Sequence, residues 1–344
     1  MTSKPLVICA PEPRTLDLIF TPKALAELRA RYDLVETTED AVANLDAATL
    51  GAARYILGQP PISAATLAKM TNLRAVLNVE SNLIDNMPYD EVFARGIHVL
   101  TTGAVFALPV AEMGIAMALD LARGVSGADQ AFQQGHEQWG GDGNANARLL
   151  SKADVGIVGF GDLGRALWRL LTGFRCNISV HDPWLPASVL HDHQVTPASL
   201  DEVLQGSDFV FVMASVTSEN RGFLGAEAFA RMRPGAAFIL LSRADVVDFD
   251  ALMAAVERGH IKAASDVFPT EPLPADHPVR TLPGFLRSAH RAGALDSAFK
   301  QMGDMVLEDM GLMDRDLPPA VCKRGRTRNR AAHAVQTRRS QLIR

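Results

Sequence analysis

The sequence predicts an α/β fold made of two doubly wound domains, one of which is inserted into the other. Short apolar runs alternate with helical patterns along most of the chain, which is typical of parallel strands joined by crossover helices. A glycine-rich strand, turn and helix, VGIVGFGDLGRALWRLL, begins only at Val155. Such a turn normally follows the first strand of its own domain. We therefore predict that another domain precedes it.

The first domain is predicted from the alternation before residue 105. The expected strands are PLVICA, ARYILG, RAVLNV and IHVLTT, and the expected helices are PKALAELRARY, SAATLAKM and YDEVFARG. This part of the sequence contains no glycine-rich phosphate turn. A long helical pattern, ALPVAEMGIAMALDLARGVSGADQAFQQG, then leads into the second domain.

The second domain restarts the alternation at Ala153, with DVGIVGF, NISVHD, FVFVMAS, AAFILLS and IKAASDVF as expected strands. The later helical pattern LDSAFKQMGDMVLEDMGLM is expected to return to the first domain. We expect both domains to be Rossmann-like or flavodoxin-like, with residues 1–104 and 294–320 in one and residues 105–293 in the other. The basic stretch 321–344 is expected to be a disordered tail.

The composition fits a globular protein, because 48% of the 344 residues are hydrophobic and 21% are charged. We find no apolar run of membrane-spanning length and no secretory signal, so we expect a cytoplasmic protein that binds no membrane. Cys9, Cys176 and Cys322 are far apart, which predicts neither a disulfide framework nor a zinc site. The net charge of −5 conceals the basic end of the chain. Because no folded nucleic-acid-reading motif accompanies that end, we do not expect nucleic-acid binding.

The turn that follows Val155 has the spacing of a dinucleotide-binding site. Gly159, Gly161 and Gly164 form G-x-G-x-x-G, in which glycine allows a tight turn, close approach of a pyrophosphate, and close packing of helix on strand. The helix N-terminus after the turn favours the phosphates. Asp182 ends the next expected strand, where an acid accepts hydrogen bonds from ribose hydroxyls. Because a carboxylate repels a ribose phosphate, we predict NAD rather than NADP. The alternative is a glycine-rich turn that binds nothing.

Three polar residues follow later strands of the second domain, at the edge where ligands bind in such sheets: Arg243, Glu271 and His290. An arginine can hold a carboxylate with two hydrogen bonds. A histidine exchanges protons near neutral pH, and a carboxylate beside it fixes its orientation. Each residue also has an ordinary interpretation, as a surface arginine, a loop acid and a structural histidine. His191 and His193 have the spacing of two ligands, but no third ligand is evident, so we predict no metal site.

These stretches together resemble the D-isomer-specific 2-hydroxyacid dehydrogenases. The matching stretches are VAEMGIAMALDLAR, GIVGFGDLG…HDP, MRPGAAFILLSRADVVDFDAL, SDVFPTEPLP and SAHRAGA. The resemblance implies an NAD-binding domain inserted into a substrate-binding domain, in a homodimeric enzyme that transfers a hydride between NAD(H) and a small 2-hydroxy or 2-oxo acid. It also implies a catalytic triad of Arg243, Glu271 and His290. The implied cofactor contacts are Gly159, Gly161, Asp162, Leu163, Gly164, Asp182, Leu241, Ser242 and, near the nicotinamide amide, Asp266.

The chain departs from the family pattern around the arginine. Relatives usually carry Asn-x-x-Arg-Gly, whereas this chain has Leu240, Arg243, Ala244 and then Asp245. A side-chain amide is lost and an acid is gained. We expect these changes to lie near the substrate and to affect its identity rather than the type of reaction.

A second departure lies in the first domain. Relatives have a glycine-rich loop whose amides hold the substrate carboxylate, whereas this chain has NVESNLID, with Leu83 after the polar residues. Ser81 and Asn82 are predicted to bind the substrate in a cleft between the domains, and Glu80 would repel a second acid group. We therefore expect glyoxylate and hydroxypyruvate to be preferred to diacids such as oxaloacetate. The alternative is that Glu80 turns away to pair with an arginine.

Two other functions are compatible with the same motifs. Phosphite dehydrogenases have a similar triad, whereas formate dehydrogenases resemble this family with a glutamine in place of Glu271. The C-terminal-binding-protein corepressors use the same fold as an NAD-responsive, non-catalytic scaffold for peptides. Turnover of a 2-oxo acid with NADH would separate an enzyme from such a scaffold.

Overall fold

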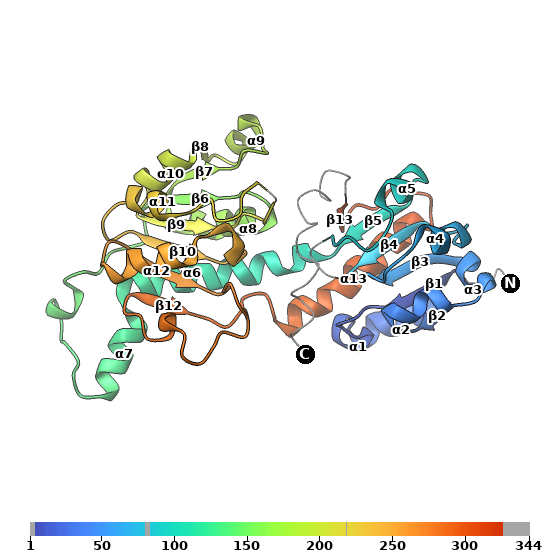
Figure 1. Cartoon of the computed structure of the whole chain (residues 1–344), viewed down its shortest axis with the longest axis horizontal. Coiled ribbons are helices and arrows are strands. Elements are labelled where there is room, and N and C mark those ends of the chain that lie inside the picture. The colour runs from blue at the N-terminus through green and yellow to red at the C-terminus, as the bar shows by residue number, and fades with distance from the viewer. Residues whose placement is uncertain (1–3, 80–82, 218, 326–344) are drawn as a thin grey trace. The chain divides into compact units, whose positions relative to one another are not determined.

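The fold was analysed on a computed structural model that describes residues 4–79, 83–217 and 219–325. The described chain forms two compact units (Figure 1). Unit 1 contains residues up to Phe106 and from Ala294 onward, and unit 2 contains Ala107–Gly293. Because unit 2 interrupts unit 1 in the sequence, the predicted α/β fold with one domain inserted into another is confirmed.

Unit 1 is built on a six-stranded sheet with the order β13-β5-β4-β3-β1-β2. All neighbouring strands are parallel except β13, which pairs antiparallel with β5. The strands are β1 (Leu6–Ala10), β2 (Asp33–Glu36), β3 (Ala53–Gly58), β4 (Ala75–Asn78), β5 (His98–Thr101) and β13 (Lys323–Arg324). The helices are α1 (Leu16–Ile19), α2 (Pro22–Arg31), α3 (Ala47–Ala52), α4 (Ala64–Lys69), α5 (Tyr89–Ala94) and α13 (Asp296–Met313), with 3-10 turns at Glu39–Asn44 and Gly103–Phe106.

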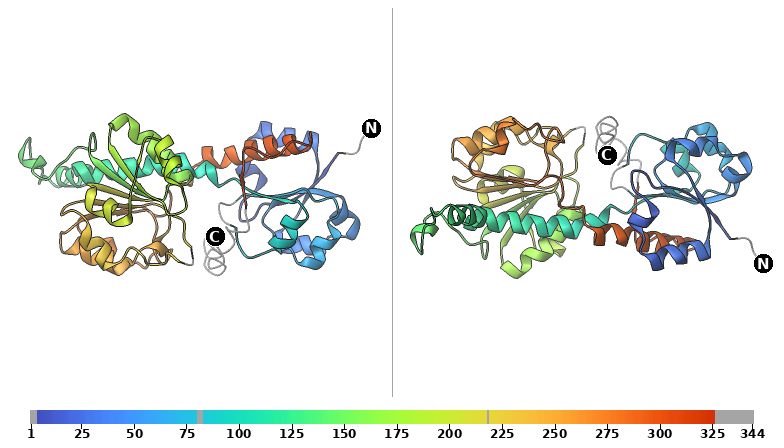
Figure 2. Two further views of the ribbon diagram at one scale, coloured as in Figure 1. Left: turned by 90° about the horizontal axis from the view of Figure 1, so that it is seen from above. Right: turned by 90° about the horizontal axis from the view of Figure 1, so that it is seen from below.

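The strands β1, β3, β4 and β5 of unit 1 are mostly buried, and alternation divides their side chains between two cores. In β1, Val7 and Cys9 join the core under α1, α2 and α13, whereas Ile8 and Ala10 join the core under α3, α4 and α5. Figure 2 shows helices on both faces of the sheet. Continuous apolar runs such as LVICA are therefore the pattern that this sheet requires.

Unit 2 is built on a seven-stranded parallel sheet with the order β12-β11-β10-β9-β6-β7-β8. The strands are β6 (Asp154–Val158), β7 (Asn177–His181), β8 (Thr196–Pro197), β9 (Phe209–Val212), β10 (Ala237–Leu240), β11 (Lys262–Ser265) and β12 (Phe285–Arg287). The helices are α6 (Ala107–Arg123), α7 (Val125–Gln133), α8 (Asp162–Leu171), α9 (Ala187–Asp192), α10 (Leu200–Gly206), α11 (Ala226–Arg231) and α12 (Phe249–Glu257), with 3-10 turns at Asp142–Asn144, Thr172–Phe174, Ala244–Val246 and Pro278–Arg280.

Each sheet has one point where the order of its strands reverses. In unit 1 the chain places β2 on one side of β1 and β3 on the other, so the reversal lies between β1 and β3. In unit 2 it lies between β6 and β9. The connections after the two strands leave in opposite directions at such a point, which opens a crevice at the carboxyl ends of the strands where ligands bind.

One segment meets the length and composition of a membrane span. The helical segment Gly103–Arg123 is long and apolar enough to cross a membrane by length and composition, although 44% of its apolar window is buried inside the structure. The burial has a packing reason, because α6 lies against α8 and β10. A Cβ atom at Gly114 would lie 2.7 Å from Leu241 Cδ1. A core helix of this kind passes the same test, so the segment is weak evidence for a membrane span.

The predicted start of the tail at residue 321 is wrong. Cys322 is buried, and Lys323 and Arg324 form β13 on the edge of unit 1. The carboxylate of Asp309, which is fully buried, accepts hydrogen bonds from the amides of Ala320 (2.7 Å), Val321 (2.9 Å) and Cys322 (2.8 Å). These bonds fix the chain before β13. The rest of the basic stretch, 326–344, lies outside the described residues.

Candidate active site

The glycine-rich turn lies at the reversal point of unit 2, and its three glycines have different surroundings. Gly159 has a φ of +92°, and a Cβ there would lie 2.7 Å from the backbone of Ala214, which follows β9. At Gly164 a Cβ would lie 2.3 Å from the carbonyl oxygen of Gly159. At Gly161, by contrast, no described atom lies within 4 Å of the added Cβ. The first and third glycines are required for packing, and the second leaves open space.

The helix α8 begins directly after Gly161. Gly161 is the N-cap residue of α8 and makes no side-chain capping hydrogen bond. Asp162 and Leu163, which begin the helix, are half-buried. The first amides of a helix lack partners within it and carry partial positive charge. This arrangement fits a pyrophosphate, as the sequence predicted.

Asp182 lies beside the turn, at the carboxyl end of β7. Its Oδ2 accepts a hydrogen bond from the amide of Phe160 (2.8 Å), and its Oδ1 accepts one from the amide of Trp184 (3.0 Å). These bonds hold the half-buried carboxylate in place. Each carboxylate oxygen can accept a further hydrogen bond. Asp182 can therefore orient the turn and still accept from a ribose diol.

Glu271 and His290 meet at the other end of the same sheet edge. His290 Nδ1 lies 2.6 Å from Glu271 Oε2, while Glu271 Oε1 accepts a hydrogen bond from the amide of Phe268 (2.8 Å). Burial alone would raise the pKa of Glu271, but the hydrogen bonds from His290 and Phe268, with the charges of His290 and Arg243, hold this pKa below its usual value. The acid is therefore ionised near neutral pH and orients a histidine whose side chain is 41% exposed.

Asp266 has a positioning role that the sequence did not indicate. It is 1% exposed, and its carboxylate accepts hydrogen bonds from the amides of Arg291 and Ala292, each at 3.0 Å. Its carbonyl oxygen accepts from the amide of His290 (2.7 Å). These contacts fix the loop in which His290 adopts a φ of +50°, a backbone conformation that few side chains adopt. The predicted contact of Asp266 with a nicotinamide amide stays a prediction.

Arg243 follows β10 at the same edge. Its Nη1 donates to the carbonyl oxygen of Ser242 (2.7 Å), and it lies near enough to Glu271 for its charge to lower that pKa. The Ser242 hydroxyl is buried and has no hydrogen-bond partner among the described residues. Leu241 is 3% exposed. The structure thus brings Arg243, Glu271 and His290 to one edge of unit 2, with an unpaired hydroxyl beside the arginine.

The residues around Arg243 that differ from the family pattern lie in the core or in an ion pair. Leu240 and Ala244 are buried in the core of unit 2, so neither side chain is available to a substrate. Asp245 accepts a hydrogen bond from Arg221 Nη1 at 2.9 Å, so the added acid is paired with an arginine. The expectation that these changes affect substrate identity stays a prediction.

The predicted residues of unit 1 cannot be placed in the same way. Glu80, Ser81 and Asn82 lie outside the described residues, and the predictions for them stay predictions. Leu83, which follows them, is 5% exposed and belongs to the core on the α4 side.

His191 and His193, the two histidines with the spacing of metal ligands, do not belong to a group of three metal-binding side chains among the described residues. His193 Nδ1 lies 2.8 Å from the carbonyl oxygen of Val189, and its ring packs edge-on against Phe160 and Trp168. Within the described ranges, no three His, Cys, Asp or Glu side chains are grouped closely enough to hold a metal ion.

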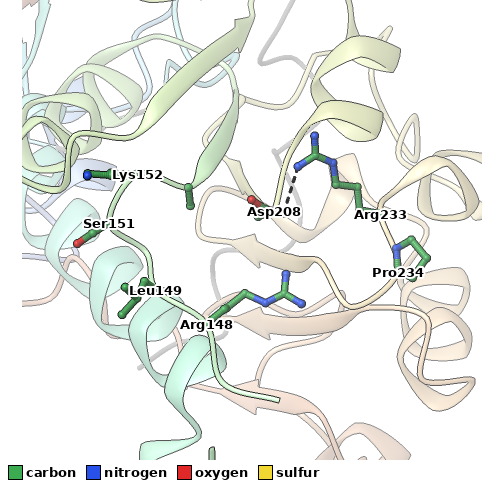
Figure 3. Close-up of a pocket in the computed structure, with 8 residues that line it drawn as sticks. Arg148, Leu149, Ser151, Lys152, Asp208, Arg233 and Pro234 are labelled. Carbon is green, nitrogen blue, oxygen red and sulfur yellow. Dashed lines mark hydrogen bonds and ion pairs between the residues drawn. The ribbon is translucent and has the colours of Figure 1, made fainter. Parts of the chain in front are cut away.

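A cavity of about 480 Å³ lies at the opposite edge of the unit 2 sheet (Figure 3). Its lining residues precede β6, β9 and β10, and they include Arg148, Lys152, Asp208 and Arg233. Arg233 is paired with Asp208 at 3.1 Å, as the dashed line in Figure 3 indicates. Because this edge holds the amino ends of the strands, the cavity is separate from the glycine turn and the triad.

Comparison with known proteins gives a consistent result. Residues 115–292 match the family model described as "D-isomer specific 2-hydroxyacid dehydrogenase, NAD binding domain". The chain is 31% identical to a glyoxylate reductase of Korarchaeum cryptofilum over 268 residues, covering 75% of this chain and 79% of the relative. It is 33% identical to a glyoxylate/hydroxypyruvate reductase B of Shigella boydii over 257 residues, covering 72% and 78%.

A solved structure is similar over nearly the whole chain. The crystal structure of a phosphoglycerate oxidoreductase from Rhizobium etli has 66% sequence identity and a TM-score of 0.89, and the match covers 94% of this chain and 99% of that one. The likeness extends through both units.

Proposed function

The chain belongs to the D-isomer-specific 2-hydroxyacid dehydrogenases, oxidoreductases that act on CH–OH donors, and we propose that it reduces small 2-oxo acids such as glyoxylate and hydroxypyruvate with NADH. The observation that carries this proposal is the 2.6 Å contact between His290 and Glu271. A histidine held by an ionised carboxylate is suited to exchange a proton with a hydroxyl or carbonyl oxygen.

The proposed roles follow from the chemistry of the three side chains. His290 gives a proton to the substrate oxygen during reduction and takes it back during oxidation. Glu271 orients the ring and stabilises its protonated form. Arg243 holds the substrate carboxylate and polarises the carbonyl group. NADH, when bound, supplies the hydride.

The proposed cofactor preference is for NAD over NADP. The open space at Gly161, which is the N-cap residue of α8, suits a pyrophosphate, and the unpaired hydroxyl of Ser242 suits a polar group of the cofactor. Asp182 would accept hydrogen bonds from the ribose diol and repel a phosphate in its place.

The proposed substrate rests on the relatives and on the unplaced loop. The two relatives above are a glyoxylate reductase and a glyoxylate/hydroxypyruvate reductase. Ser81 and Asn82 are proposed to donate to the substrate, and Glu80 to disfavour diacids. The phosphoglycerate oxidoreductase at 66% identity favours a second candidate, a 2-hydroxy acid that carries a phosphate.

We also propose a homodimer in the cytoplasm. None of the residues of α7 is buried, and Figure 1 shows α7 extending away from the sheet of unit 2. Phe132 is 61% exposed and Trp139 is 74% exposed, with their ring centroids 6.3 Å apart. Contiguous exposed aromatic surface of this kind is typical of an interface. Light scattering should therefore report a dimer, and Trp139→Ser should shift it toward the monomer.

A panel of acids tests the proposed reaction. NADH oxidation is measured with glyoxylate, hydroxypyruvate, phosphohydroxypyruvate and oxaloacetate, and NAD reduction is measured with phosphite. We expect turnover of the first two. Preference for the phosphorylated acid would support the second candidate, and turnover of phosphite alone or of no compound would contradict both.

A further inference from the structure

We propose that the cavity at the amino ends of β6, β9 and β10 binds a small dianion, a phosphate or phosphate monoester, and that Arg148 holds it. This site lies apart from the one that carries the proposed function, and the inference does not rest on that function. The cavity measures about 480 Å³ (Figure 3). Ligand pockets typically measure about 300–1,000 Å³, so a small molecule fits.

One wall of the cavity is a tight turn between α11 and β10. The amide of Ala236 donates to the carbonyl oxygen of Arg233 (3.0 Å), and Gly235 between them has a φ of +73°. Proline at the second position of a turn and glycine at the third, as in Pro234 and Gly235, are typical of a type II turn. The amide of Gly235 donates to the carbonyl oxygen of His260 (2.6 Å). Backbone hydrogen bonds therefore hold this wall in place.

The acids beside the cavity are already paired with Arg233. Its Nη1 lies 3.0 Å from Asp154 Oδ2 and 3.1 Å from Asp208 Oδ1. Its Nε donates to the carbonyl oxygen of Gln205 (3.1 Å). Two acids and one arginine thus form a fixed group on this wall. Two further cations line the cavity, Arg148 and Lys152, so that cations outnumber acids and an anion is attracted.

Arg148 is a cation that no acid of the described chain neutralises. Its side chain is half-buried and makes no hydrogen bond or ion pair with the described residues. Its Nη2 lies 3.0 Å from the place that a Cβ on Gly235 would take, so the glycine leaves room for the guanidinium. A charge that is partly removed from water costs free energy unless it is paired. An anion in the cavity supplies the missing partner.

The chemistry of the lining residues indicates the kind of anion. A guanidinium is planar and can donate to two oxygens of one phosphate at the same time. Lys152 is exposed and points away from both arginines in Figure 3, so it adds positive charge without a fixed geometry. Leu149, which is 67% exposed, offers apolar surface to the organic group of an ester. The excess of cations is small, which favours a dianion over a polyphosphate.

The position of the cavity separates it from the cofactor site. The glycine turn and Arg243 follow the carboxyl ends of β6 and β10, whereas the cavity lies at the amino ends of these strands. A ligand in the cavity therefore does not compete with NADH. Phosphate should still bind to this site when NADH occupies the glycine turn.

Phosphate binding to the NADH-saturated protein tests the proposal. Titration calorimetry measures the Kd of inorganic phosphate and of glycerol phosphate at one ionic strength, set with chloride because salt screens exposed charges. Arg148→Gln should weaken the binding of both about 10- to 100-fold, the range of hydrogen bonds to a charged group. Arg148→Lys keeps the charge and loses the planar donors, so its Kd should lie between those of the parent and Arg148→Gln. The Kd for NADH should not change in either variant.

Lys69→Gln is the matched control, because it removes one exposed positive charge from the end of α4 in unit 1. It should leave both Kd values unchanged. Equal losses in Arg148→Gln and Lys69→Gln would overturn the inference, since they would report the overall charge and not a site.

The inference is also overturned if the NADH-saturated parent binds neither compound, or if Arg148→Gln binds them as tightly as the parent. Tm is measured for every variant. If Arg148→Gln does not fold, parental affinity in Arg148→Lys overturns the inference instead. None of these outcomes depends on turnover of a 2-oxo acid, so failure of the proposed function and failure of this inference are distinguishable.

Discussion

The two units contain the same kind of reversal point, and in both a glycine lets the ends of two strands approach each other through backbone. In unit 1, Gly58 has a φ of +128°, and a Cβ would lie 1.7 Å from the carbonyl oxygen of Ala10, so the ends of β3 and β1 close on each other through backbone. In unit 2, a Cβ at Gly161 would meet no described atom within 4 Å. Gly159 packs against the backbone of Ala214 in the same way as Gly58 packs against Ala10, so the units differ in the further glycine of unit 2, Gly161, which leaves open space.

This difference separates two ways of binding a ligand on one topology. The open turn of unit 2 offers backbone amides and a helix N-terminus. These groups suit a phosphate, whatever the phosphate is attached to. The closed point of unit 1 leaves no comparable open space beside the backbone at Gly58.

The largest effect is expected at the triad of unit 2. His290→Ala should lower kcat by about 10²- to 10⁴-fold, the usual contribution of a general acid or base. NADH binding, which we assign to the glycine turn, should be nearly unchanged by titration calorimetry. A variant with full activity would show that the proton comes from elsewhere.

A pair of glycine substitutions tests the comparison directly. Gly58→Ala should lower the free energy of unfolding by about 2–6 kcal/mol, because it combines a strained φ with overpacking against Ala10. Gly161→Ala should change it by less than about 0.5 kcal/mol, and it should still weaken NADH binding. Denaturant unfolding and NADH titration of both variants measure this. Equal destabilisation of the two variants would remove the distinction between a closed and an open crevice.

Asp182→Asn should reduce the preference for NADH over NADPH by about tenfold, equivalent to about 1.4 kcal/mol. The substitution removes the negative charge that repels a ribose phosphate, and asparagine keeps an oxygen that can accept from the amide of Phe160. The two Kd values give the result. A parent that binds NADPH as tightly as NADH would contradict the role given to Asp182.

Glu271→Gln should change the pH dependence of reduction more than its maximum rate. The pKa of Glu271 lies below its usual value of 4.5, so its effect is present at neutral pH and is lost only as the pH falls through that lowered value. Without the charge, the protonated ring of His290 is less stable. The fall of kcat at rising pH should therefore begin at a lower pH than in the parent. An identical pH profile would contradict the pairing.

The smallest effect is expected at the basic end. A chain that stops after Gly325 keeps β13, and it should match the parent in Tm and activity. A chain that stops after Ala320 loses β13 and the buried Cys322, and it should have a lower Tm. Loss of activity in the longer chain would show that residues 326–344 have a role. Nucleic-acid binding that this deletion and moderate salt abolish would indicate an electrostatic one.

The sequence alone determined the features that depend on neighbouring residues. Alternating apolar runs predicted the two parallel sheets, and the spacing of Gly159, Gly161 and Gly164 predicted the turn between β6 and α8. Asp182 was identified by its place at the end of the next strand. These features are local, because strand, turn and helix patterns extend over a few residues.

Only the tertiary structure decided how distant residues meet. Asp266 hydrogen-bonds to the amides of Arg291 and Ala292, 25 and 26 residues further along the chain. Asp309 holds the segment before β13, of which Val321 and Cys322 had been assigned to a disordered tail. No local pattern contains such contacts, because they depend on which strands become neighbours and which end of each strand lies at the edge. Whether a half-buried arginine such as Arg148 finds an acid is decided at the same level, by what the rest of the fold places beside it.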